Sequence, residues 1–163
     1  MEDEFLLFLN ENLGVIHRIC RIYFPDRPEE REDLYQEILY QAWKSYPGFR
    51  GDAKFSTWLY KIGLNTAIVH FRKIKRRPDR SDVTDRLLEI PDSSGSANGS
   101  DHAETLMQAV KTLSPVDKAI VSLYLEDYSY EEIAQTMGIS RSNVSVRLVR
   151  IKNQIAQKIK NEL

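Results

Sequence analysis

Cysteine and histidine are scarce in this chain, which has one cysteine and three histidines among 163 residues. A single cysteine excludes an intrachain disulfide and a metal site built from several thiolates. The histidines are scattered, at positions His17, His70 and His102, so we expect no metal site and no other cofactor. Cys20 lies in an apolar helical pattern and is predicted to be a small buried side chain.

Long apolar runs and a secretory signal are also missing. No stretch approaches the roughly 20 apolar residues that a helix needs to span a bilayer. The chain begins with MEDEFLLFLNENLG, which is acidic and has only a short apolar run, unlike a signal peptide. We therefore expect a cytoplasmic protein with no membrane insertion.

The net charge is only −1, but the charges are distributed unevenly. Residues 38–77 carry a net charge of +8 and residues 138–163 a net charge of +5, whereas the remaining segments are acidic. Two basic blocks with acidic neighbours favour two DNA-facing surfaces and separate faces for another partner.

Helical periodicity covers most of the chain, and no segment shows the alternation expected of a strand. Residues 78–102 are rich in Ser, Gly, Asp and Asn, the composition of a flexible linker. We predict an all-α fold with two small helical domains, at 1–77 and 103–163, joined by this acidic linker. The predicted helices are, in order, residues 3–24, 29–46, 56–76, 103–113, 115–126, 130–137 and 140–160.

Residues 129–160 have the pattern of a helix-turn-helix. Ser129 and Glu132 match a capping box, Gly138 suits the turn, and Ser140 can cap the second helix. That helix has an apolar stripe formed by Val144, Leu148, Ile151, Ile155 and Ile159. Its other faces carry side chains suited to a DNA major groove, namely Ser142, Asn143, Val146, Arg147 and Arg150. The alternative is an ordinary helical hairpin with a solvated basic face.

The predicted helix at 56–76, which Ser56 can cap, has a second mixed surface. One of its faces carries an amide, an aromatic ring and cations, namely Trp58, Lys61, Asn65, Arg72 and Arg76. The loop before it adds Arg50, Lys54 and Phe55. Cations neutralise phosphates and aromatic rings stack on unpaired bases, so the mixture favours single-stranded or melted DNA. A plain solvated face, with Trp58 partly in the core, is the alternative.

The helix before this one has a different outer face. Leu34, Ile38 and Ala42 are predicted to point inward. The outer positions are acidic and rich in amides, namely Asp33, Gln36, Glu37, Tyr40 and Lys44. An acidic face does not suit DNA, so it is either solvated or a protein-docking surface.

Taken together, these segments resemble a bacterial RNA polymerase sigma factor of the extracytoplasmic-function (ECF) group, sigma-E-like. Residues 33–73, DLYQEILYQAWKSYPGFRGDAKFSTWLYKIGLNTAIVHFRK, are similar to region 2 of that family. Residues 113–155, LSPVDKAIVSLYLEDYSYEEIAQTMGISRSNVSVRLVRIKNQI, are similar to region 4. The resemblance covers both domains, their order and the linker.

The resemblance implies an alternative sigma factor, a transcription initiation factor without catalytic residues. Its first implied partner is core RNA polymerase, through the clamp helices of the largest subunit and the flap of the second largest. Its second partner is promoter DNA, and an anti-sigma factor or a recruiting protein is a further one. The residues implied in clamp docking are Asp33, Gln36, Glu37 and Tyr40. Those implied at the minus-ten element are Arg50, Lys54, Phe55, Trp58, Lys61, Asn65, Arg72 and Arg76. Those implied at the minus-35 element are Arg141, Ser142, Asn143, Ser145, Val146, Arg147 and Arg150.

The chain departs from the family pattern in its predicted recognition helix. Family members often have a basic residue where Ser145 stands and a small polar residue where Val146 stands. Val146 and Val149 are apolar on the outward side, where they suit either thymine methyl groups or a protein. One hypothesis is that region 4 reads DNA weakly and is helped by a recruiting partner.

Other classes of protein remain as alternatives. A stand-alone helix-turn-helix regulator binds a symmetric operator without polymerase, but it leaves Lys61, Asn65 and Arg72 without a role. A nuclease or invertase needs a nucleophile or clustered carboxylates, and Asp33 and Glu37 have no third acidic partner. A sigma-like chain recruited to DNA by another complex, or one without promoter activity, would keep the same fold.

Overall fold

A computed structural model describes residues 2–76 and 100–162. The chain forms two compact units, residues 1–71 and residues 72–163, and each is described by itself. The predicted linker at 78–102 lies outside the described residues, except for residues 100–102, which begin a helix.

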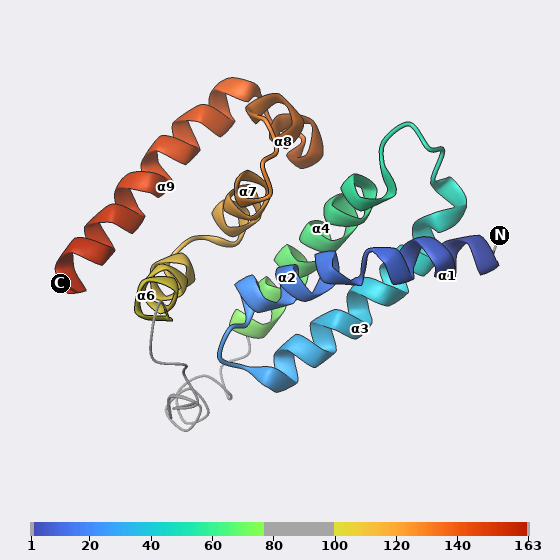
Figure 1. Cartoon of the computed structure of the whole chain (residues 1–163), viewed down its shortest axis with the longest axis horizontal. Helices are drawn as coiled ribbons and strands as arrows, with labels where there is room; N and C mark the ends of the chain where they lie inside the picture. Colours follow the sequence, from blue (N-terminus) through green and yellow to red (C-terminus); the bar gives the residue numbers. More distant parts are fainter. Residues whose placement is uncertain (1, 77–99, 163) are drawn as a thin grey trace. The chain divides into compact units, whose positions relative to one another are not determined.

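Every regular element in the described residues is helical, which confirms the all-α prediction (Figure 1). The first part of the chain contains α1 (Glu2–Glu11), α2 (Leu13–Tyr23), α3 (Pro28–Ser45), the 3-10 helix η1 (Tyr46–Gly48) and α4 (Phe55–Lys75). The second part contains α6 (Ser100–Lys111), α7 (Pro115–Leu125), α8 (Tyr130–Met137) and α9 (Arg141–Glu162).

Two details of the first domain differ from the prediction. Residues 3–24 form two helices rather than one, because the chain breaks at Asn12. The side-chain amide of Asn12 donates to the carbonyl of Phe8 at 2.8 Å, and its backbone N–H donates to the carbonyl of Leu9 at 2.9 Å. Such local bonds compete with the helical ladder. Ser56 is not an N-cap, because α4 already begins at Phe55.

The core of the first unit forms where α2, α3 and α4 pack together. Leu34, Ile38 and Ala42 are fully buried on α3, as predicted. Gly63 on α4 lies against Ile19 of α2, where an added Cβ would come within 2.6 Å of the Ile19 Cδ1 atom. The missing side chain therefore permits the close approach of α2 and α4.

Capping bonds define the helix-turn-helix as predicted. The Ser129 hydroxyl accepts from the Glu132 N–H at 3.1 Å, and the Glu132 carboxylate accepts from the Ser129 N–H at 2.9 Å. Gly138 adopts the left-handed conformation with φ of 70°, which ends α8. The Ser140 hydroxyl accepts from the Asn143 N–H at 3.1 Å at the start of α9. The two predicted caps and the predicted turn of the helix-turn-helix are therefore confirmed.

α9 lies along the other helices of the second unit and buries the first three residues of its apolar stripe against them, whereas Ile155 and Ile159 are half-buried (Figure 1). Val144, Leu148 and Ile151 are at most 1% exposed. In the first unit, Cys20 is buried as predicted, and burial raises the pKa of its thiol to about 12. No helix among the described residues has the length and apolar character required to cross a bilayer.

Candidate nucleic-acid interface

α4 presents one basic and amide face and one buried face, which is the arrangement that the sequence predicts. Leu59, Leu64 and Ala67 are fully buried on the inner side. The exposed positions of the helix and its last turn include Lys61, Asn65, Arg72 and Arg76. A helix fixed by its buried face holds these groups in one line, which suits contacts along a nucleic-acid backbone.

The loop between η1 and α4 is open and partly basic. Arg50 and Lys54 are exposed at its two ends. Gly51 has φ of 77°, a conformation that other residues adopt at a cost. A Cβ at this position would meet no atom within 4 Å, so the glycine serves the shape of the loop rather than a packing need.

Aromatic rings gather under this loop. Phe55 is only 8% exposed, and its ring centroid lies 5.4 Å from that of Phe8 and 5.2 Å from that of Trp58. Phe49 stacks on Tyr46 and lies 5.2 Å from the half-buried Trp58. Because Phe55 is enclosed by other rings, it supports the loop from below, whereas Trp58 is only half-buried.

Two members of this aromatic cluster were not predicted from the sequence. Phe5 and Phe8 come from α1, far from the loop in sequence, and Phe5 lies 4.9 Å from Tyr46. The N-terminal helix is rich in aromatic residues, but this pattern is also typical of side chains in a hydrophobic core, so it did not indicate contact with the loop. α1 therefore fixes the position of the loop as well as covering the core.

The outer face of α3 is exposed along its whole length. Its exposed residues are Asp33, Gln36, Glu37, Tyr40, Trp43 and Lys44. Tyr40 and Trp43 are 56% and 47% exposed, large values for aromatic side chains. Exposed aromatic rings are typical of a protein-docking surface, and charged groups such as these carboxylates suit its rim.

α9 also has an exposed outer face and a buried inner face. The exposed residues predicted at its N-terminal half include Arg141, Ser142, Asn143, Val146 and Arg150, and Ser145 is half-buried. Arg147 differs from the rest, because its guanidinium is bonded within the domain. Its Nη1 donates to the Asp117 carboxylate at 2.9 Å, and its Nε donates to the Asn143 side-chain carbonyl at 3.1 Å.

Asp117, at the start of α7, was not predicted as a functional residue. Its carboxylate is 7% exposed and also lies 3.6 Å from the Arg150 guanidinium. The Ser114 hydroxyl accepts from the Asp117 N–H at 3.1 Å and caps the helix that carries it. An acidic residue in the first turn of a helix is normally explained by the helix dipole. There was therefore no reason in the sequence to expect that Asp117 also anchors α9.

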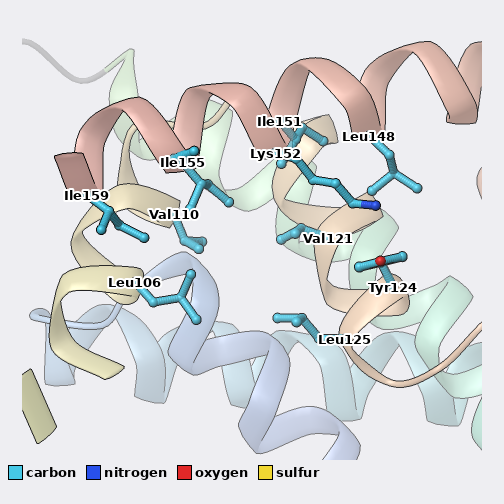
Figure 2. Close-up of a pocket in the computed structure, with 11 residues that line it drawn as sticks. Leu106, Val110, Val121, Tyr124, Leu125, Leu148, Ile151, Lys152, Ile155 and Ile159 are labelled. Carbon is cyan, nitrogen blue, oxygen red and sulfur yellow. The ribbon is translucent and has the colours of Figure 1, made fainter. Parts of the chain in front are cut away.

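The second unit contains an apolar groove between α6, α7 and α9 (Figure 2). Its volume is about 250 Å³, and it is lined by Leu106, Val110, Val121, Tyr124, Leu125, Leu148, Ile151, Lys152, Ile155, Ala156 and Ile159. The Lys152 ammonium lies 4.6 Å from the centre of the Tyr124 ring at one side. A hydrogen bond to Tyr124 raises the pKa of Lys152. The groove therefore suits an apolar helix or strand of a partner.

Two helical units with basic faces, one of them a helix-turn-helix, are typical of a DNA-binding protein. Sigma-70 region 2 matches residues 8–77, and Sigma-70, region 4 matches residues 103–155. The RNA polymerase sigma-H factor of Pseudomonas aeruginosa is 34% identical over 162 residues, covering 92% of this chain and 81% of the relative. The ECF RNA polymerase sigma-E factor of Escherichia coli K12 is 33% identical over 138 residues, covering 78% of this chain and 72% of the relative.

Solved structures share the fold. The sigma factor RpoE of Bartonella quintana, in complex with the anti-sigma factor NepR, matches with a TM-score of 0.66 and 23% identity over 94% of this chain and 96% of that chain. CnrH in complex with the cytosolic domain of CnrY matches with a TM-score of 0.68 and 19% identity over 100% of this chain and 92% of that chain.

The chain belongs to the sigma-70 family. It is an alternative sigma factor of the ECF group, which binds core RNA polymerase and promoter DNA and directs transcription initiation. The family is thus confirmed, together with two of the predicted partners, core RNA polymerase and promoter DNA.

Proposed function

We propose that this sigma factor divides initiation among four surfaces. The outer face of α3 docks on the clamp helices of the largest polymerase subunit, and the groove of the second unit receives the flap of the second largest. The loop before α4 and the exposed face of α4 bind and melt the minus-ten element. The N-terminal half of α9 enters the major groove at the minus-35 element.

The docking role of α3 rests on its exposed aromatic and acidic groups. Tyr40 and Trp43 offer apolar area that water would otherwise cover, and Asp33 and Glu37 offer charge on the same face. Buried aromatic anchors within a polar rim are the usual energetic core of a protein interface. Carboxylates also repel DNA, which separates this face from the basic face of α4.

The melting role rests on the aromatic cluster beneath an open loop, and this is the observation that carries the proposal. Extruding a base costs roughly a few kcal/mol. Stacking on an aromatic ring returns about 1–3 kcal/mol per base, and cations such as Lys61 add phosphate contacts. The rings around Trp58 hold it in place, so little side-chain freedom is lost when a base stacks on it.

The flap role rests on the chemistry of the groove. Its lining is almost wholly aliphatic, and Leu125 at its edge is 55% exposed. An amphipathic segment of a partner buries this surface with one row of apolar side chains. An anti-sigma factor that covers the same groove would compete with polymerase, in keeping with the anti-sigma complex of the Bartonella quintana relative.

The remaining parts complete the proposal. Residues 1–77 act as region 2, residues 103–163 act as region 4, and residues 78–102 connect them while both are bound to polymerase. The chain acts without catalysis of its own, in the cytoplasm, where polymerase and promoter meet. Free of polymerase it binds promoter weakly, since both domains need polymerase to fix their spacing.

The test separates docking from melting with two variants. Replacing Asp33 and Glu37 with alanine is expected to weaken polymerase association while the assembled complex still opens promoters. Asn65→Ala is expected to do the reverse, with normal association and slower opening. The matched control for the double variant replaces two exposed acids of α1, Asp3→Ala with Glu11→Ala. The matched control for Asn65→Ala is Asn10→Ala, an exposed amide of the same helix α1.

Association is measured by co-sedimentation with core polymerase, and opening by permanganate reactivity of unpaired thymines. If both variants lose association and opening to the same extent, the division of roles is wrong. If the unmodified protein binds a duplex specifically but never associates with core polymerase, the proposed function fails as a whole.

A further inference from the structure

The bonds of Arg147 change which residues of α9 are available to DNA. Its guanidinium is shared between Asp117 at 2.9 Å and Asn143 at 3.1 Å, so two of its five N–H donors have acceptors within the domain. The Asn143 side-chain carbonyl is the acceptor in one of these bonds. Arg147, which the sequence suggested for base recognition, therefore fixes α9 on α7, and the Asn143 side chain holds it from one turn earlier on α9.

Val146 and Val149 are the prominent apolar groups on the outside of the same helix. They are 65% and 57% exposed, whereas Val144, on the opposite side, is fully buried. An aliphatic side chain with this exposure loses contact with water only when something covers it. Arg147, which follows Val146 in the chain, is directed to Asp117, whereas the Arg150 side chain beside Val149 is 59% exposed.

The charge of α9 identifies the partner of these valines. Residues 138–160 contain six lysines and arginines and no acidic residue. A surface of this kind is attracted to a polyanion, which favours DNA over an acid-poor protein surface. The apolar group that a base pair presents in the major groove is the C5-methyl group of thymine.

We propose that Val146 and Val149 determine promoter specificity by contacting the methyl groups of neighbouring thymines in the minus-35 element. Arg147 is a positioning residue in this arrangement. Three residues along a helix advance about 4.5 Å, which lies between one and two base-pair steps of about 3.4 Å each. The two valines are therefore spaced to contact methyl groups on neighbouring base pairs. This inference rests on the proposed role of α9 at the minus-35 element.

Deoxyuridine, which lacks the methyl group of thymine, provides the test. Holoenzyme is assembled from the full chain and core polymerase, and its equilibrium binding is measured on a promoter identified by run-off transcription. Each thymine of the minus-35 element is then replaced by deoxyuridine. A buried methyl contact contributes about fourfold in affinity, so two lost contacts weaken binding about tenfold or more.

A double variant, Val146→Ser with Val149→Ser, is measured on both promoters. We expect it to bind the thymine promoter as weakly as the unmodified protein binds the deoxyuridine promoter, and to be insensitive to the replacement. Leu7→Ser, an apolar residue of similar exposure on α1, is the matched control and should keep the full sensitivity.

Other results overturn the proposal. The valines do not read methyl groups if the minus-35 element lacks neighbouring thymines, or if deoxyuridine weakens the unmodified and serine proteins equally. Normal promoter binding by the purified serine variant, with loss of its activity in cells, assigns the valines to a protein partner instead. Failure of the unmodified chain to form holoenzyme is a separate result, which refutes the proposed function and this inference together.

Discussion

Replacing Asp117 with asparagine removes the carboxylate that anchors α9 and leaves the shape of the side chain nearly unchanged. Its bond to Arg147 is largely buried on the acid side, at 7% exposure, and partly buried on the arginine side, at 29%. A hydrogen bond to a charged group contributes about 1.5–3 kcal/mol, and partial exposure places this one at the lower end. The exposed Arg150 contact adds little.

The same carboxylate lies in the first turn of α7, where a negative charge contributes about 0.3–1 kcal/mol. The whole loss is therefore about 2 kcal/mol, or a factor of about 30 in the opening equilibrium of the second domain. Hydrogen exchange of the buried amides of α9, at Leu148 and Ile151, measures this opening directly. We expect these amides to exchange about 30 times faster in Asp117→Asn.

Asp127→Asn is the matched control, since Asp127 is an exposed aspartate of the same domain with φ of 64°, a conformation that asparagine tolerates. It should leave exchange in α9 unchanged. In a double-mutant cycle, Arg147→Gln should cost much less in the Asp117→Asn background than in the unmodified chain. Exchange rates in Asp117→Asn within twofold of the unmodified protein would refute the anchoring role.

Three further changes test the local physical arguments. Ser129→Ala removes the capping box and should lower the free energy of unfolding of the second domain by about 1 kcal/mol, measured by hydrogen exchange in α8; an unchanged rate would contradict the cap. Gly138→Ala forces a Cβ into the left-handed region and should cost about 1–2 kcal/mol in the same assay, whereas the exposed Gly48, which has negative φ, should accept alanine at little cost. Burial raises the pKa of Cys20 to about 12, so its thiol stays protonated in the folded protein. Because the thiol ionises in the unfolded chain above its ordinary pKa of 9.0, the free energy of unfolding falls as the pH rises past this value. Iodoacetamide at mildly alkaline pH should therefore label only unfolded chains, as read by mass spectrometry, and rapid labelling of the native protein would contradict this.

Local features of the fold could be predicted because their causes lie within a few residues. Ser129, Gly138 and Ser140 each act on a backbone group three or four positions away, so their spacing alone identified the helix-turn-helix. The inward positions of α3 followed in the same way from helical periodicity. The break at Asn12 was missed because the apolar pattern on either side continues through it.

Tertiary features could not be predicted from spacing. Asp117 and Arg147 are thirty positions apart, and only the packing of α7 on α9 brings them together. Phe55 looked like an open stacking ring, but α1 and η1 enclose it. The groove of the second unit is built from three helices, none of which indicates a cavity by itself. In each case the role of a residue depends on residues of other helices that pack against it, and sequence spacing does not show which ones these are.

Transcription by core RNA polymerase with this protein as its only sigma factor shows whether the protein initiates transcription. Core polymerase is mixed with the full chain and genomic DNA fragments, and run-off transcripts are mapped. We expect stable association and discrete start sites that share one promoter sequence, with thymines in its minus-35 element. Specific duplex binding by the protein alone, without association with polymerase and without new start sites, would contradict this expectation.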